Sequence, residues 1–328
     1  MEEIVVSVFC LAYNHEKYIR NALEGFVMQK TNFAFEVLIH DDASTDNTAK
    51  IIKEYERQYP NIIKPIYQTE NQYSKRVKIT RDILLPQAKG KYFAWCEGDD
   101  YWTVPLKLQK QVDFLSANPE YATCVHRAKH LNTRNNTFYY CPDITEERDF
   151  STEEIICGEG GIFETNSLMQ TREAYINRPD VFSAKWAGDY QLFVHGSIYG
   201  KCRCLYDCMS VYNAYTESSW TLNVWADKER RKQYLKSRYD MLKKVDEYYN
   251  FKYHGAIDYV VRRIEFDLFE LNGNKKSMRL PQYKEFYKTY RINKTKEKLR
   301  TRIPFLLKIK KLYQRILSKK GKANYASE

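Results

Sequence analysis

The chain has 328 residues, of which 43% are apolar and 29% charged, a balance typical of a soluble globular protein. No apolar run approaches the roughly 18 residues that a transmembrane helix needs, so a membrane-spanning protein is not expected. The net charge of +11 is confined to one end, because residues 291–328 hold thirteen Lys and Arg and two Glu while residues 1–290 are neutral. The basic character therefore belongs to a tail.

Short apolar runs alternate with helical patterns at intervals of about thirty residues over the first hundred positions. Strands are predicted at 4–11, 35–40, 62–67 and 92–96, and helices at 15–29, 45–60 and 80–88. Continuous apolar and β-branched runs are typical of strands buried on both faces. The alternation predicts βαβ units, and hence an α/β fold with a mostly parallel sheet flanked by helices.

Polar clusters follow three of the predicted strands at the point where each strand ends. They are Asn14, the pair Asp41–Asp42 and the run Glu97–Asp100. In open α/β sheets, ligands bind at the carboxyl edge of the strands, so we expect the three clusters to form one site. The sequence lacks the glycine patterns of a Rossmann dinucleotide site and of a P-loop. A bound phosphate would therefore be held by a metal and by side chains.

The run Glu97–Asp100 places three carboxylates within four residues. Carboxylates this close repel one another unless a cation lies among them. Mg²⁺ or Mn²⁺ prefers oxygen ligands and commonly takes one or two carboxylates plus substrate phosphate oxygens. The run therefore predicts a metal and phosphate site, and an acidic turn without a ligand is the alternative.

Cysteine and histidine spacing gives little support for zinc. Cys202, Cys204 and Cys208 are close together, but the alternation of the first two suits one face of a strand, and no second ligand pair follows. His126 and His130 lie in a segment that reads as extended or irregular, so structural roles are expected for both.

Three motifs occur in the order and spacing of a known family. They are VSVFCLAYN at 6–14, VLIHDDASTDNT at 37–48, and the segment 88–102, in which AKGKY precedes EGDDYW. Over residues 4–115, and more loosely to about 220, the chain resembles the family-2 glycosyltransferases of GT-A fold. The resemblance implies a Rossmann-like sheet, a nucleotide-sugar donor that is usually a UDP-sugar, and Mn²⁺ or Mg²⁺ as cofactor.

The resemblance also assigns donor-binding residues. Asp41 matches the family residue that holds the uracil edge, and Ala12 and Tyr13 would line the base pocket. Asp99 matches the metal ligand, and Glu97 stands where a shorter acid addresses the ribose. The donor-binding set is Ala12, Tyr13, Asn14, Asp41, Arg81, Glu97, Gly98, Asp100 and Trp220.

Three members of this set have less specific roles. Asp100 would lie near the donor sugar, and Trp220 would bound the sugar pocket. Arg81 matches a basic residue near the base and phosphate, and a solvated helix charge is its alternative.

The resemblance makes Asp189 the catalytic base, at the start of a helix that runs through Phe193. A helix N-terminus favours the carboxylate form, which would keep this acid ionised at neutral pH. The alternative is that Asp189 caps its helix. Relatives often carry Arg and His where this chain has Asn213 and Tyr215, which weakens the case for a third protein ligand of the metal.

We expect three parts: a catalytic domain at 1–224, a helical appendage at 225–290 and a basic amphipathic tail at 291–328. Within the tail, residues 304–319 place apolar and basic side chains largely on opposite faces, which predicts binding to an anionic membrane surface. A helix docked on its own protein is the alternative, and no motif supports nucleic acid. The acidic start, Met-Glu-Glu-Ile, is unlike a signal peptide, so we expect a cytoplasmic protein. If the tail binds membrane, the protein would be held peripherally at the inner face of the plasma membrane.

The resemblance therefore implies an inverting, metal-dependent glycosyltransferase acting on an acceptor hydroxyl, in surface polysaccharide or lipid-linked saccharide synthesis. Residues 134–160 are polar and turn-rich, and we expect a mobile segment there on the acceptor side. A non-catalytic scaffold or binding protein is one alternative. A nucleotidyltransferase is the other, although it would need a glycine- and lysine-rich loop near the first strand.

Overall fold

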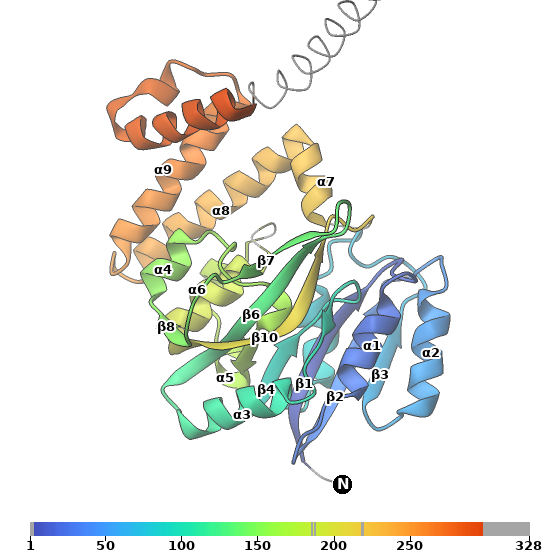
Figure 1. Cartoon of the computed structure of the whole chain (residues 1–328). Helices are drawn as coiled ribbons and strands as arrows, with labels where there is room; N and C mark the ends of the chain where they lie inside the picture. Colours follow the sequence, from blue (N-terminus) through green and yellow to red (C-terminus); the bar gives the residue numbers. More distant parts are fainter. Residues whose placement is uncertain (1–2, 185, 187, 218–219, 298–328) are drawn as a thin grey trace, which may run out of the picture. The chain divides into compact units, whose positions relative to one another are not determined.

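The structure is a computed structural model that describes residues 3–184, 186, 188–217 and 220–297. By its internal contacts the chain divides into two compact units, Met1–Val261 and Arg262–Glu328 (Figure 1). The first unit contains all of the predicted site residues. The predicted boundaries at 224 and 290 stay a prediction.

The first unit is built on a ten-stranded mixed sheet whose leading part is parallel. Its strands β1 (Ile4–Ala12), β2 (Ala34–Asp41), β3 (Ile63–Tyr67) and β4 (Tyr92–Trp95) pair in the order β3-β2-β1-β4. All three pairings are parallel. Their carboxyl ends therefore share one edge, as the sequence predicts, and the α/β fold with flanking helices is confirmed.

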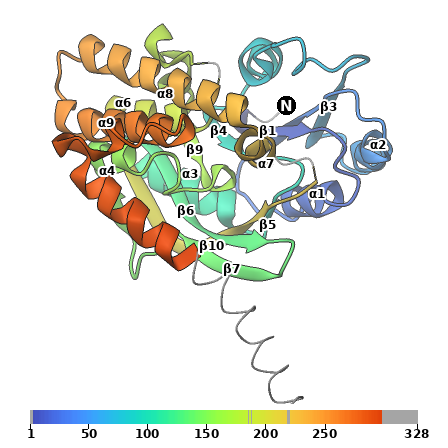
Figure 2. The same ribbon diagram turned by 90° about the horizontal axis from the view of Figure 1, so that it is seen from above.

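The remaining strands continue the sheet as β9-β6-β10-β5, with β7 beside β6 (Figure 2). Strand β8 pairs with β10. The bounds of these strands are β5 (Tyr101–Trp102), β6 (Tyr121–Asn132), β7 (Thr137–Cys141), β8 (Arg148–Phe150), β9 (Met169–Thr171) and β10 (Lys201–Ala214). Strand β10 is one long strand whose pairing with β6 has register shifts around Leu205–Ser210. Within the expected mobile segment 134–160, backbone pairing to β6 and β10 forms β7 and β8.

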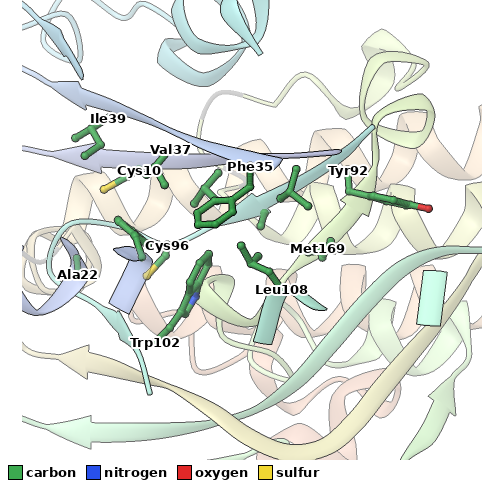
Figure 3. Close-up of a cluster of buried hydrophobic side chains, with 14 of the residues drawn as sticks. Cys10, Ala22, Phe35, Val37, Ile39, Tyr92, Cys96, Trp102, Leu108 and Met169 are labelled. Carbon is green, nitrogen blue, oxygen red and sulfur yellow. The ribbon is translucent and has the colours of Figure 1, made fainter. Parts of the chain in front are cut away.

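Helices with an apolar stripe cover the parallel strands. In α1 (Ile19–Val27) the side chains of Ile19, Leu23 and Phe26 recur at helical spacing and are fully buried. They join a core with residues of α2 (Thr48–Gln58), α3 (Lys107–Ala117) and one face of the sheet (Figure 3). The expected helix at 80–88 is a short π-helix, Thr80–Leu84, followed by a 3₁₀ turn, Leu85–Gln87.

Shorter helices α4 (Thr152–Cys157), α5 (Arg172–Ile176) and α6 (Tyr190–Tyr199) lie between the later strands. After β10 come α7 (Trp220–Ala226), α8 (Lys228–Tyr248) and α9 (His254–Leu271). Short 3₁₀ turns lie at Thr165–Ser167, Asp180–Phe182, Ser277–Arg279 and Pro281–Tyr283, and a further helix occupies 284–297.

The second unit has its own small core of Phe266, Met278 and Tyr283. The predicted amphipathic stretch 304–319 lies outside the described residues. Within the described part of the chain, every helix is too short or too polar to span a bilayer.

Candidate functional site

Asp100 anchors the acidic turn that follows β4. The side chain is buried, and both of its oxygens accept hydrogen bonds from the protein. Asn166 Nδ2 donates to Oδ2 at 3.1 Å, and the backbone N–H of Asn213 donates to Oδ1 at 2.8 Å. Burial and the neighbouring Asp99 raise the pKa of Asp100 well above its usual range. These contacts tie the turn to the end of β10.

Asp99 is less buried than Asp100. Thr216 Oγ1 donates to Asp99 Oδ2 at 3.0 Å, and His15 Nε2 lies 4.0 Å from the same oxygen. Asn213 Nδ2 donates to the backbone oxygen of Asp99 at 2.6 Å. Asn213 thus holds the backbone of the acidic turn.

Gly98 lies where there is no room for a side chain. A Cβ at this position would come within 2.9 Å of both His15 Nδ1 and Ile19 Cδ1. The close approach brings the loop after β1 against the acidic turn after β4. His15 was not among the predicted site residues, although it directly follows Asn14 in the motif.

The loops after β1 and β2 are joined by hydrogen bonds through Asn14. Its backbone N–H donates to Ser44 Oγ at 3.0 Å, and its Oδ1 accepts from the Thr45 N–H at 2.8 Å. Asn14 has a φ of 55°, a left-handed conformation that Asn adopts more readily than most residues. The two loops therefore form one wall.

Asp41 is the last residue of β2, at the base of this wall, and one of its oxygens is shielded from solvent. It is buried, and its Oδ1 has no hydrogen-bond partner among the described residues. Burial raises the pKa of Asp41, while hydrogen bonds from Ser44 oppose the rise. Of the predicted base-pocket residues, Ala12 is buried and Tyr13 is 41% exposed. Tyr13 can therefore present a ring face to a planar ligand.

Asp189 lies at the N-terminus of α6, but its side chain makes no capping hydrogen bond there. Instead, Thr165 Oγ1 donates to Asp189 Oδ2. Burial and the charge of Glu164 raise the pKa of Asp189, although the Thr165 hydrogen bond opposes the rise. The expected lowering by the helix N-terminus is thus outweighed by the surrounding protein.

Glu97 begins the acidic turn, directly after the end of β4 and Cys96. Although Glu97 is exposed, desolvation by the surrounding protein raises its pKa to about 8, together with the negative charges of Asp99 and Asp189. This repulsion acts on Glu97 from both Asp99 and Asp189. A cation or a proton among them would relieve it.

Three consecutive residues that the sequence did not single out organise the site. Glu164 accepts from or donates to His130 Nδ1 according to their protonation, at 2.7 Å. Thr165 contacts Asp189, and Asn166 contacts Asp100. The segment was visible in the sequence only as a polar interruption of an apolar run.

Other predicted residues lie elsewhere or are not described. Arg81 forms an exposed ion pair with Asp180, in which Arg81 Nη1 lies 3.8 Å from Asp180 Oδ1. Trp220 begins α7, but its side chain lies outside the description. Cys202 and Cys204 are buried on β10, as their alternation predicts.

A divalent cation fits the donor set if the substrate supplies most of its ligands. Within the described residues, no three His, Cys, Asp or Glu side chains form a ready-made metal cage. Asp99 Oδ2 accepts the Thr216 hydrogen bond, and the carboxylate keeps further acceptor capacity beside Glu97. One carboxylate plus phosphate oxygens is a common arrangement for Mg²⁺, and Mn²⁺ takes similar oxygen ligands.

Comparison with known proteins matches residues 7–171 to the family described as glycosyl transferase family 2. An uncharacterised protein of Mycobacterium tuberculosis is 36% identical over 215 residues, which cover 66% of this chain and 60% of that protein. The chain thus matches less than two thirds of that relative's length. The Escherichia coli enzyme WfaP, named a UDP-Glc:alpha-D-GlcNAc-diphosphoundecaprenol beta-1,3-glucosyltransferase, is 35% identical over 111 residues, or 34% of this chain and 41% of WfaP.

Among solved structures, TarS 1-349 of S. aureus in complex with UDP-GlcNAc superposes with a TM-score of 0.61 at 19% identity. The superposition covers 85% of this chain and 78% of TarS 1-349. At this level of identity the likeness concerns the fold.

Proposed function

This chain belongs to glycosyl transferase family 2, and we propose that it transfers a sugar from a UDP-sugar to an acceptor hydroxyl with inversion at the anomeric carbon. The observation that carries the proposal is the convergence of the loops after β1, β2 and β4, where His15 Nε2 lies 4.0 Å from Asp99 Oδ2 and the Asn14 N–H donates to Ser44 Oγ. The wall formed by the loops after β1 and β2 contains the Tyr13 ring and the Oδ1 of Asp41, which is unpartnered within the described part of the chain. The turn after β4 contains Glu97 and Asp99.

The donor would bind along the carboxyl edge of the parallel strands. Tyr13 would pack its exposed ring on the uracil, and Asp41 Oδ1 would accept a hydrogen bond from the edge of the base. Glu97 would contact the ribose, and Asp99 would hold Mn²⁺ or Mg²⁺ together with the diphosphate. When bound, the cation would offset the negative charge that develops on the leaving nucleotide.

Asp189 would take the proton from the acceptor hydroxyl as the hydroxyl attacks the anomeric carbon. The hydrogen bond from Thr165 orients the carboxylate and leaves its other oxygen for the acceptor. A single attack on the face opposite the departing nucleotide inverts the configuration. The acceptor class named for WfaP, a diphosphoundecaprenol-linked sugar, supports a lipid-linked saccharide acceptor in surface polysaccharide synthesis.

The test is release of UDP from a panel of UDP-sugars, with Mn²⁺, with Mg²⁺ and with EDTA. We expect turnover of one donor, its loss in EDTA and its restoration by the added cation. Asp99→Asn should abolish metal-dependent turnover, and Asp189→Asn should lower kcat for transfer by about 10²- to 10⁴-fold, the range for a lost general base. Glu153→Gln removes an exposed carboxylate on α4 and serves as the control.

Two outcomes would contradict the proposal. Transfer by Asp189→Asn at the wild-type rate would remove Asp189 from the role of base. Failure to bind or turn over any UDP-, GDP- or dTDP-sugar would instead favour a non-catalytic binding protein.

A further inference from the structure

A row of aromatic rings crosses three neighbouring strands of the first unit. His130 on β6 pairs with Tyr139 on β7 and with Tyr212 on β10. The rings of His130 and Tyr139 are stacked, with centroids 4.4 Å apart and planes 16° apart, and the Tyr212 ring lies 5.1 Å from His130. Directly paired residues point to the same side of a sheet, so the three rings share one face.

The row of rings is connected to Asp189, the proposed catalytic base, through residues 164 and 165. His130 Nδ1 lies 2.7 Å from Glu164 Oε1, and the next residue, Thr165, donates to Asp189. A ligand packed on these rings would thus extend toward the atom that removes the acceptor proton. The donor loops follow β1 and β2, which are separated from β6 by β4 and β9 in the sheet.

The outer end of the row is open. Tyr139 is 57% exposed, so its side chain is accessible to a ligand. Strands β6 and β7 pair as an antiparallel hairpin. The neighbours of Tyr139 on β7, Phe138 and Tyr140, face the opposite side of this hairpin. There, Lys129 Nζ lies 4.3 Å from the Phe138 ring centroid, and the Arg127 guanidinium lies 4.8 Å from that of Tyr140.

We propose that Tyr139, His130 and Tyr212 form the subsite for the acceptor sugar, a pyranose ring whose apolar face packs on the Tyr139 ring. The inference rests on the proposed function and identifies where that reaction takes its second substrate. A pyranose presents C–H groups on its flat faces and hydroxyls around its edge, so it matches an exposed ring flanked by the Glu164 carboxylate. An apolar body with a few convergent polar groups is also the usual composition of a small-molecule site.

The experiment compares Tyr139→Ala, Tyr139→Phe and the adjacent control Phe138→Ala in the full chain. Two rates are measured with the donor found above: UDP release without acceptor, and transfer to methyl glycosides of common hexoses and N-acetylhexosamines. We expect Tyr139→Ala to raise the acceptor KM at least about tenfold, corresponding to about 1.4 kcal/mol, with the donor KM and acceptor-free UDP release unchanged. Tyr139→Phe and Phe138→Ala should keep the wild-type acceptor KM.

Saturation-transfer NMR with the same glycosides supplies a readout that does not need turnover. Signal on the sugar C–H protons should be present in wild type and lost in Tyr139→Ala. An equal acceptor KM in Tyr139→Ala and Phe138→Ala overturns the inference, as does a wild-type protein that releases UDP but gives no saturation transfer to any glycoside. A wild-type protein that neither binds nor hydrolyses a donor overturns the proposed function instead.

Discussion

The carboxylates of the site differ in how many of their oxygens the protein already occupies. Asp100 has a hydrogen bond on each oxygen and is buried, so it stabilises the turn. Asp99 and Asp189 each accept a hydroxyl hydrogen bond on one oxygen, from Thr216 and Thr165. Asp99 and Asp189 therefore keep acceptor capacity, which the proposed reaction needs from both.

The hydrogen bond from Thr165 should set the pH at which the base ionises. It favours the charged form of Asp189, whereas burial and Glu164 favour the neutral form. Thr165→Val removes the donor at nearly constant volume, so the pKa of Asp189 should rise further. Because the base works when ionised, the acidic limb of kcat/KM for transfer should move to higher pH, by about one pH unit for a lost bond of about 1.4 kcal/mol.

Thr165→Ser keeps a hydroxyl at this position and is the matched control. Its pH profile should overlay that of wild type. An acidic limb that stays in place in Thr165→Val, or that moves to lower pH, would show that Thr165 does not stabilise the ionised base. The measurement is a pH profile of acceptor transfer at saturating donor.

At the level of elements, a buried polar network fixes the start of β4 against β1 and β2. Ser7 Oγ donates to Glu36 Oε1 at 2.8 Å and accepts from the Gly90 N–H at 2.8 Å. The Lys89 N–H donates to the same Glu36 oxygen at 2.9 Å. The network sets how far β4 extends, and therefore where the acidic turn at its end lies.

Gly90 should be intolerant of a side chain for this reason. A Cβ there would lie 2.4 Å from the backbone N of Ser7 and 2.7 Å from the backbone C of Val6. Gly90→Ala should lower the free energy of unfolding by about 3 kcal/mol, since the backbone of a central strand cannot give way cheaply. Urea unfolding followed by circular dichroism measures the effect.

Gly255→Ala is the comparison, because a Cβ at Gly255 in α9 meets no atom within 4 Å. There the free energy of unfolding should stay constant or rise by up to about 1 kcal/mol. Equal stability of the two variants would mean that β1 and β4 can separate at Gly90 without cost.

The elements that could be predicted from sequence are those whose pattern is local. The strands ending in Asp41 and before Glu97 are apolar runs followed by acids, so both the parallel sheet and the edge where the acids meet could be read directly. Strand β7 could not, because residues 137–140 are exposed and their pairing with β6 comes from tertiary context rather than an apolar period.

The residues that contact the predicted acids and His130 could not be predicted from sequence for a related reason. Glu164, Thr165 and Asn166 meet partners 34, 24 and 66 positions away. A single sequence does not show which of these distant residues contact one another. Asp99 and Asp189 could be predicted because the family resemblance assigns a role to each. His15 was easier to predict, since it directly follows the predicted residue Asn14.

For the whole molecule, the net charge is confined to one end of the chain. Residues 1–290 are neutral and contain the proposed site, while residues 291–328 carry the entire net charge of +11. A neutral body has no general attraction to anionic membranes, so any such attraction should reside in the tail. If the acceptor is lipid-linked, the tail would raise the local concentration of enzyme at the surface where that acceptor lies.

Replacing five basic tail residues by Gln tests this division in the full chain. The positions are Lys308, Lys310, Lys311, Arg315 and Lys319. Binding to vesicles containing phosphatidylglycerol should weaken by about 1 kcal/mol per removed charge, and wild-type binding should fall with added salt. The control replaces five exposed lysines of the first unit, Lys228, Lys236, Lys243, Lys244 and Lys252, by Gln.

The control removes the same net charge and should bind the vesicles almost as wild type does, because attraction within a Debye length depends on where the charges lie. UDP release from a soluble donor should be unchanged in both variants, since neither set belongs to the site. Equal weakening in the two variants would mean that net charge alone governs the attraction. Unchanged binding of the tail variant would favour the alternative in which residues 304–319 dock on the protein.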